Sequence, residues 1–250
     1  MRGSVIILIR IAILAAVLLA WEALPRLGFV NPMLLPPLSE VLATLVAILG
    51  RGDVHEALGV TGAEVVVAFL VAVPLGTALG VLAAENEYFG AIFRPMLFYV
   101  FSIPKSIFLP MFILVFGIGF QQKVAYATFS TLFIVIMSAS AAVESVKSEY
   151  LLVAQSYGAT PAQILRRVYL PSMLPILLEA LRISMIFNFT GVMIAEMYAA
   201  RTGIGNMIAN WGENFQMPQL FAGVLLLAVV AMLFNEGVRA LETRCSTWRT

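Results

Sequence analysis

The sequence is poor in charge, in cysteine and in histidine. Only 12% of its 250 residues are Asp, Glu, Lys or Arg, whereas 61% are hydrophobic, and the mean hydropathy is +0.97. A soluble domain carries about 25% charged and about 45–50% apolar residues, so this composition excludes an ordinary soluble enzyme or binding domain. A single cysteine, Cys245, excludes an internal disulfide, and with the single histidine, His55, it leaves no cluster for a zinc or redox site. The composition indicates a polytopic membrane protein.

Two further absences limit the chemistry of the chain. The formal net charge of +1 lacks the basic excess of nucleic-acid binders, so we predict no nucleic-acid partner. No G-x-x-x-x-G-K-S/T motif occurs, so the chain has no P-loop, and ATP-driven work would need a partner chain. We predict no catalytic, cofactor-binding or metal-binding residue in this chain.

Apolar runs predict an all-α fold with about six transmembrane helices. A span needs about 20 mostly apolar residues, and the runs near this length are Ser4–Trp21, Val60–Ala84, Phe98–Phe116, Val124–Val146, Met173–Tyr198 and Leu220–Val238. Arg10 interrupts the first run, so a secretory signal peptide remains an alternative to a retained helix. No clean cleavage site of small residues follows this run, because Trp21 and Glu22 stand where such a site would lie. We therefore predict a retained first helix.

The distribution of Lys and Arg predicts that both termini are cytoplasmic. An even number of spans permits this arrangement, which places nine basic residues inside and four outside, while Lys105 and Arg182 lie within or near spans. The inner set is Arg2, Arg10, Arg94, Lys147, Arg166, Arg167, Arg239, Arg244 and Arg249, and the outer set is Arg26, Arg51, Lys123 and Arg201.

Residues 23–59 form an outer segment that is too long for a turn. After a proline-rich start, Ser39 is predicted to cap a helix over Glu40–Leu49 that Gly50 and Gly52 end. Apolar residues at helical spacing predict that this helix lies on the outer membrane surface; they are Val41, Leu42, Leu45, Val46 and Leu49.

The residue pattern of the inner segment 147–171 predicts a helix, a sharp break and a second, short helix. Gly158 can end the first helix in the left-handed conformation. Thr160 is a good N-cap and Pro161 suits the first helical position. Pro171 lacks a backbone donor and disfavours helix at the preceding residue, so we expect it to end the short helix.

The short helix would expose apolar side chains beside two arginines. Ile164, Leu165 and Val168 are the apolar residues, and Arg166 and Arg167 lie between them. Either a protein partner binds this surface, or the loop lies on the bilayer with its arginines on anionic lipid. The physical argument alone leaves both open.

This inner segment resembles the EAA loop of bacterial ABC importer permeases. The pattern there is E-A-A, three residues, Gly, nine residues and I-x-L-P. The positions in register are Ala154, Gly158, Val168, Leu170 and Pro171, whereas Leu152 and Val153 depart from the first two positions.

Further similarity to the nitrate/sulfonate/taurine permease group covers residues 32–245. The matching segments are Leu35–Val41, Ile103-Pro104-Lys105, Leu109–Gly119, Ala195-Glu196-Met197 and Gly203-Ile204-Gly205. One departure is Glu64, which stands near a position where those permeases often carry Arg.

The resemblance implies the fold of a type I ABC importer permease, with a cytoplasmic coupling helix and an outer amphipathic helix. It implies a first helix over 1–22, an outer loop over 23–59, a permease core over 60–240 and a cytoplasmic tail over 241–250. The expected partners are a second permease copy, two cytoplasmic ABC ATPase subunits that bind ATP–Mg, an extracytoplasmic solute-binding protein and membrane lipid. The expected location is the bacterial inner membrane. The residues expected to couple to the ATPase are Ala154, Gly158, Ala159, Thr160, Pro161, Ile164, Leu165, Arg166, Arg167, Val168, Leu170 and Pro171.

Four charged residues in or near the spans are candidates for a translocation pathway or gate: Glu64, Lys105, Arg182 and Glu196. A charge in a spanning helix usually faces a partner or a wet cavity. The competing interpretations are interfacial solvation of Glu64, exposure of Glu196, and a Lys105 side chain that reaches the inner surface. For Arg182 the favoured interpretation is an i,i+3 ion pair with Glu179.

Two other function classes compete with the permease. A self-contained secondary transporter would need its own coupling-ion site and often an internal repeat, and we find no convincing repeat. An intramembrane enzyme would need a paired catalytic set that these isolated acids and single histidine do not supply. The sequence determines neither the substrate nor whether the pore is a homodimer or a heterodimer.

Overall fold

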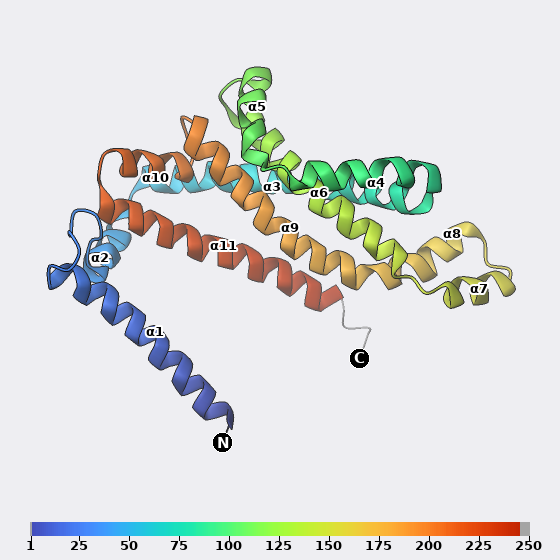
Figure 1. Ribbon diagram of the computed structural model, residues 1–250, viewed down its shortest axis with the longest axis horizontal. Helices are drawn as coiled ribbons and strands as arrows, with labels where there is room; N and C mark the ends of the chain where they lie inside the picture. The colour runs from blue at the N-terminus through green and yellow to red at the C-terminus, as the bar shows by residue number, and fades with distance from the viewer. Residues whose placement is uncertain (1, 246–250) are drawn as a thin grey trace.

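The computed structural model describes residues 2–245, which form helices and loops without a strand (Figure 1). This confirms the all-α prediction. Five helices are long and apolar enough to cross a bilayer, or six if one bent pair is counted as a span. The straight spans lie in α1 (Arg2–Arg26), α3 (Gly52–Glu85), α6 (Phe120–Glu144), α9 (Leu170–Ala199) and α11 (Met217–Cys245).

Helix α6 is the centre of the bundle, and α3 and α9 pack along it. Two glycines of α3 permit the close approach expected of small residues in membrane helices. A Cβ added at Gly80 would lie 2.5 Å from the Ile136 carbonyl oxygen, and one added at Gly76 would lie 2.7 Å from Val135 Cβ. The backbones of α3 and α6 therefore meet at a distance that side chains would not allow.

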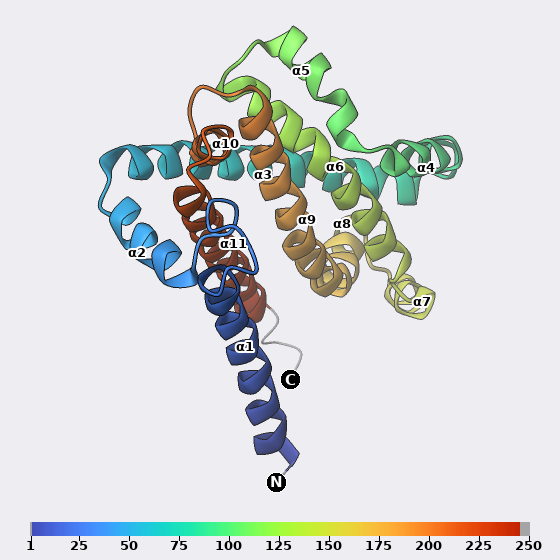
Figure 2. The same ribbon diagram turned by 60° about the vertical axis from the view of Figure 1, so that its left-hand side comes forward.

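A second core lies at the end of the bundle where α2 (Leu38–Leu49) and α10 (Ile204–Glu213) pack against α11 (Figures 1 and 2). Val41 and Ile48 of α2 are buried there against Trp211 and Leu226. Leu42, Val46 and Leu49 are exposed. The prediction that all the apolar positions of this helix face the membrane surface is therefore wrong for Val41, because α11 supplies a protein surface to cover it.

Ser39 is not the N-cap of α2, contrary to prediction. The helix begins at Leu38, after Pro37. The backbone N–H and the hydroxyl of Ser39 each donate to the Glu22 carboxylate at 2.9 Å. The carboxylate at the end of α1 thus satisfies a first-turn donor that a cap would otherwise satisfy. The helix ends before Gly50, as predicted.

The predicted span Phe98–Phe116 is wrong as a single helix. It is divided into α4 (Glu87–Ser102), η1 (Lys105–Phe108) and α5 (Leu109–Phe116), and the axis bends by 92° at the break. Ile103 is extended, and Pro104 lacks the N–H that would continue the helix. Figure 2 shows α5 turned away from α4.

The inner segment contains α7 (Ser148–Ser156), α8 (Pro161–Ile164) and the π-helical turn η2 (Leu165–Tyr169). The predicted end of the short helix at Pro171 is wrong, because the chain passes through η2 directly into α9. Helix continues from Pro161 to Ala199. The π-turn shifts the hydrogen-bond register by one residue, with Leu170 N donating to the Leu165 carbonyl, and this local change lets the helix continue through Pro171.

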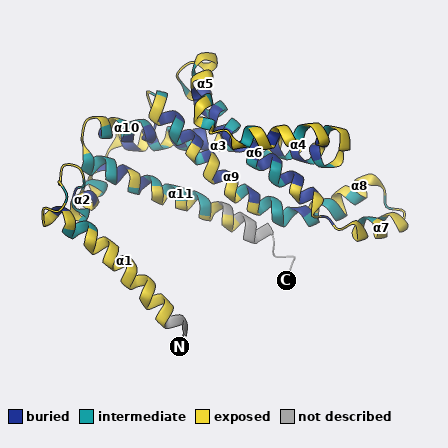
Figure 3. Cartoon of the chain, viewed as in Figure 1, coloured by how far each residue is buried: buried dark blue, intermediate teal, exposed yellow. Residues whose placement is uncertain are grey.

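Helix α1 is exposed along residues 5–20 (Figure 3). It is attached at its last turns, where Trp21 Nε1 donates to the Pro36 carbonyl at 3.1 Å and the indole packs edge-on against Phe221. Helix α11 extends to Cys245, so the predicted tail over 241–250 is helical in its first half. Residues 246–250, including Arg249, lie outside the described residues.

Candidate transport and coupling sites

Four polar side chains, Thr61, Glu64, Lys123 and Glu196, form a buried group that we name the Lys123 cluster. Lys123 Nζ forms an ion pair with Glu64 and lies 4.0 Å from Glu196 Oε1. Neither carboxylate side chain is exposed, and that of Lys123 is 1% exposed. The cluster joins α3, α6 and α9. Because an isolated charge is very costly in a dry interior, each of these charges depends on the others.

Glu196 also binds the N-terminus of α10. Gly205 N donates to Glu196 Oε2 at 2.7 Å, and the Thr61 hydroxyl donates to Oε1 at 2.7 Å. Thr61 in turn accepts from Ile204 N at 3.0 Å. A helix N-terminus favours a carboxylate because its free N–H groups and dipole are positive.

The carboxylate of Glu196 occupies the space that a side chain at Gly203 would need. A Cβ added at Gly203 would collide with it, and Gly203 has a φ of +110°. Lys123 Nζ also donates to the Thr202 carbonyl at 3.1 Å. The glycine-containing loop before α10 is thereby fixed to α6 and α9.

The structure brings together two predicted candidates, Glu64 and Glu196, with a residue that the sequence analysis placed in an outer loop, Lys123. Interfacial solvation of Glu64 and simple exposure of Glu196 are both wrong, because both side chains are fully buried. The sequence does not mark Lys123 as a site residue, because it directly precedes an apolar run, where basic loop residues commonly flank a span. A pathway or gate role for these residues stays a prediction.

Lys105 and Arg182 lie apart from this cluster. Lys105 Nζ donates to the Phe101 carbonyl at 2.6 Å and lies 4.0 Å from the centre of the Phe101 ring, so its ammonium group is held against the end of α4. Arg182 Nε donates to Asn235 Oδ1 of α11 at 3.3 Å. No ion pair with Glu179 is formed in the described part of the chain, so that prediction is wrong. Asn235 offers an uncharged acceptor across the helix interface.

The inner segment extends beyond the bundle at the end opposite α10 (Figure 1). Gly158 has a φ of +73°, as predicted for a left-handed helix end. Thr160 caps α8 in a reciprocal capping box: its hydroxyl accepts from Gln163 N at 3.4 Å, and the Gln163 side chain accepts from Thr160 N at 2.9 Å. The predicted break and restart of the helix are confirmed.

Only part of the predicted apolar surface of this segment is exposed. Leu165 is 52% exposed, and Arg166 and Arg167 are exposed beside it. Ile164 and Val168 are half-buried, and Val168 packs against a core that includes Val143 and Met173. Of the other predicted coupling residues, Gly158, Thr160, Pro161 and Leu170 are exposed, and Ala154, Ala159 and Pro171 are half-buried.

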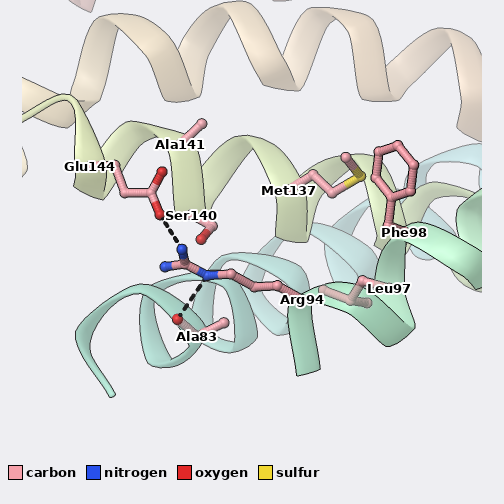
Figure 4. Close-up of a pocket in the computed structure, with 8 residues that line it drawn as sticks. All are labelled: Ala83, Arg94, Leu97, Phe98, Met137, Ser140, Ala141 and Glu144. Atoms are coloured by element: carbon pink, nitrogen blue, oxygen red, sulfur yellow. Dashed lines mark hydrogen bonds and ion pairs between the residues drawn. The ribbon is translucent and has the colours of Figure 1, made fainter. Parts of the chain in front are cut away.

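The inner ends of the spans are held together beside a cavity. Arg94 of α4 forms an ion pair with Glu144 of α6 at 2.5 Å and donates from Nε to the Ala83 carbonyl of α3 at 3.2 Å (Figure 4). A separate cavity of about 380 Å³ lies between α3 and the inner segment, and Glu85, Gln155 and Leu165 are among its lining residues. The inner segment is thus anchored through Val168 but is not packed tightly against α3.

Over residues 76–246 the chain matches the family described as binding-protein-dependent transport system inner membrane component. The chain belongs to this family. It is 32% identical to the taurine transport system permease protein TauC of Escherichia coli (strain K12), over 95% of this chain and 88% of that protein. It is 27% identical to the putative aliphatic sulfonates transport permease protein SsuC of Bacillus subtilis (strain 168), over 95% and 86% of the two chains.

The fold agrees with this membership. A chain of the inward-facing MetNI methionine ABC transporter matches with a TM-score of 0.62 at 20% identity, over 80% of this chain and 96% of that one. The chain is therefore a transmembrane permease subunit of an ABC importer, of the nitrate/sulfonate/taurine group. The alternative of a self-contained secondary transporter is set aside.

Proposed function

We propose that two copies of this permease form a pore in the bacterial inner membrane, with both termini of each in the cytoplasm. Two cytoplasmic ATPase subunits, which bind ATP–Mg, associate with the inner segment, and an extracytoplasmic binding protein delivers the solute. The permease itself carries out no catalysis. The family membership and the Lys/Arg distribution support this arrangement.

The observation that carries the proposal is the unbroken helix from Pro161 to Ala199. One end of this helix bears the exposed Leu165 with Arg166 and Arg167, and the other end bears Glu196 of the Lys123 cluster. Ile164 and Glu196 are separated by about 50 Å at about 1.5 Å per residue. A displacement of the inner segment is therefore transmitted along one continuous helix that ends at the loop before α10.

The contacts that anchor the inner segment separate the residues that dock on the ATPase from those that transmit its movement to the spans. Leu165 is free to enter a hydrophobic cleft of the ATPase, while Arg166 and Arg167 can pair with acidic groups at its rim. Val168 packs on α6 and α9, so it transmits the displacement of the docked helix to the spans.

We further propose that the solute is a small organic oxyanion of the sulfonate class. Two relatives, a taurine permease and a putative aliphatic sulfonates permease, support this class. A relative at 28% identity, from Halalkalibacterium halodurans, is a formylaminopyrimidine permease. The taurine permease of Escherichia coli, at 32% identity, is more similar to this chain than the formylaminopyrimidine permease is, which favours the sulfonate class.

The docking role is tested with Leu165→Asp in the permease co-expressed with its ATPase. A carboxylate buried in an apolar cleft without a partner is strongly disfavoured, so we expect loss of ATPase co-purification and of hydrolysis stimulated by the binding protein. Met33→Asp is the control, because Met33 is 73% exposed in the loop at the opposite end of the bundle.

A loop that lies on lipid would tolerate the change. If Leu165→Asp retains wild-type association and stimulated hydrolysis, the inner segment is not the ATPase docking element. Normal membrane insertion of both variants is checked by size-exclusion chromatography in detergent.

A further inference from the structure

A pocket lies where the broken span meets α6 and α9, and its wall is mostly apolar, formed in part by Ile186, Phe187 and Ile194. Its volume is about 260 Å³, and its polar lining consists of Lys105 and Ser106 of η1, Tyr126 and Ser130 of α6, and Thr190 of α9. Tyr126 and Ser130 form the buried side of the pocket, whereas Ser106 and Thr190 are exposed at its opening. We name it the Lys105 pocket.

The charge of Lys105 has no carboxylate partner among the residues that the structure describes. Its ammonium group is stabilised by the Phe101 carbonyl at 2.6 Å and by the face of the Phe101 ring at 4.0 Å. These contacts use only part of its three donors. The remaining donor capacity and the net positive charge are therefore available to an anion.

The Ser130 hydroxyl adds a further donor in this pocket, whereas the Thr190 hydroxyl already donates to the Ile186 carbonyl at 2.8 Å. Ser130 is buried and lies beside Tyr126 without a well-formed hydrogen bond. Ser130 and Thr190 lie on different helices and face the same pocket as Lys105. An ammonium group and a hydroxyl without a partner that line one pocket are a suitable environment for the oxygen atoms of a sulfonate, carboxylate or similar oxyanion.

The position of the pocket also indicates a passage for solute. Ionisable residues within spans face the bundle interior or a water-filled cavity, and backbone that is not helical at membrane depth is tolerated only where protein or water covers it. The break at Ile103 and Pro104 and the charge of Lys105 coincide at this pocket. Along α6, Ser130 lies about 10 Å from Lys123, at about 1.5 Å per residue.

The size of the pocket restricts the ligand. Drug-sized ligands occupy pockets of about 300–1,000 Å³, so about 260 Å³ fits a molecule with few heavy atoms. The Phe101 carbonyl competes for the ammonium group, which keeps the affinity low. A site on a conduction path needs such weak binding, because the solute must leave it again.

We propose that the Lys105 pocket is a subsite that binds the oxyanion group of the solute during passage through the permease. This inference rests on the sulfonate class of solute proposed above. Lys105 supplies the charge, Ser130 supplies a hydrogen bond, and the α4–α5 break makes the lysine accessible.

The test uses the complete complex, with the ATPase and the binding protein, in proteoliposomes with taurine as the probe. We compare Lys105→Gln, which can still donate to the Phe101 carbonyl, with Lys105→Arg, which keeps the charge. Taurine uptake should fall at least about tenfold in Lys105→Gln, the scale expected for one lost hydrogen bond to a charged group. Lys105→Arg should retain most of the uptake, and Arg239→Gln, which alters an exposed pair with Glu236, should leave it unchanged.

A second measurement does not depend on transport. Saturation-transfer NMR with taurine, on the permease–ATPase complex without binding protein, should detect the methylene protons for the wild type and for Lys105→Arg but not for Lys105→Gln. If Lys105→Gln fails to assemble, Ser130→Ala takes its place, with the same expected loss.

The outcomes separate the two proposals. If the wild type imports no taurine or other small oxyanion, the proposed solute class is wrong, and the subsite is lost with it. If the wild type imports taurine but the assembled Lys105→Gln complex matches it in uptake and in NMR signal, the solute class stands and the subsite is overturned.

Discussion

Lys123 and Glu64 form an ion pair between α6 and α3 in which both side chains are closed off from the surface. Glu196 lies on the other side of the ammonium group, with its Oε1 at 4.0 Å. Two carboxylates therefore share one lysine, and Glu196 obtains the rest of its stabilisation from Thr61 and the N-terminus of α10. The arrangement links three spans to the loop before α10.

The first prediction is that Lys123→Met destabilises the fold strongly. It leaves two buried carboxylates without a cation, and breaking a buried pair in this way typically costs about 3–5 kcal/mol. The double variant Lys123→Met with Glu64→Gln should recover part of the loss, because it removes one of the two uncompensated charges. Thermal unfolding of the purified proteins in detergent measures both. Equal unfolding temperatures for Lys123→Met and the wild type would contradict the prediction.

The second prediction concerns the contact of α3 with α6. Gly80→Ala should lower stability, because its Cβ would lie 2.5 Å from the Ile136 carbonyl oxygen and would force the helices apart. Gly62→Ala in the same helix is the control. No atom lies within 4 Å of its added Cβ, so it should be neutral or stabilising by up to about 1 kcal/mol through helix propensity. The two variants are compared by thermal unfolding, and the same sign of effect for both would refute the packing argument.

The third prediction concerns the backbone at Gly158. A β-branched residue resists a φ of +73° by roughly 1–2 kcal/mol, and no atom crowds the added Cβ. Gly158→Val should therefore shift α8 while the spans stay packed, so that stimulated ATPase activity falls and the unfolding temperature changes little.

Gly28→Val is the matched control for this change. Gly28 has a φ of +79° and equally open surroundings, but it lies in the loop at the other end of the bundle. It carries the same backbone strain and should leave ATPase activity unchanged. Wild-type stimulated hydrolysis in Gly158→Val would show that the left-handed turn has no part in coupling.

The fourth prediction concerns orientation. Tyr157 is 88% exposed. In a Cys245→Ser background, the new thiol of Tyr157→Cys should be labelled by a membrane-impermeant reagent only after the cells are permeabilised. A cysteine at Phe29, which is 75% exposed, should be labelled in intact cells. The reverse pattern would overturn the cytoplasmic placement of the inner segment.

Structural features that are set by residues a few positions apart along the chain could be predicted from the sequence. The apolar runs gave five straight spans, and the Gly158, Thr160 and Pro161 pattern gave the left-handed turn and the cap of α8. The helix predicted over Glu40–Leu49 ends at Gly50 as expected, although it begins at Leu38. Each of these depends on backbone conformation and hydrogen bonds within a few residues, so the local residue types suffice.

The effect of the two prolines was decided by the surrounding chain. Pro104 lies at a break in the run that is predicted as one span. At Pro171 the helix continues, because a π-turn directly before the proline shifts the hydrogen-bond register. Both lack the same N–H group. What differs is that the π-turn before Pro171 shifts the register while Val168 and Met173, on either side of the proline, stay packed against α6.

The charged residues show the clearest division between sequence and tertiary structure. The hydropathy pattern marks Glu64, Lys105 and Glu196 as charged residues in or near membrane spans, where a charge usually needs a partner or a water-filled cavity. It does not indicate that Glu64, Lys123 and Glu196 meet, because 59 and 73 residues separate them successively along the chain. The packing of α3, α6 and α9 brings them together. The sequence alone therefore determined the membrane class, most of the helices and the local turns. Only the tertiary structure decided which charges are paired, because pairing depends on distances between helices.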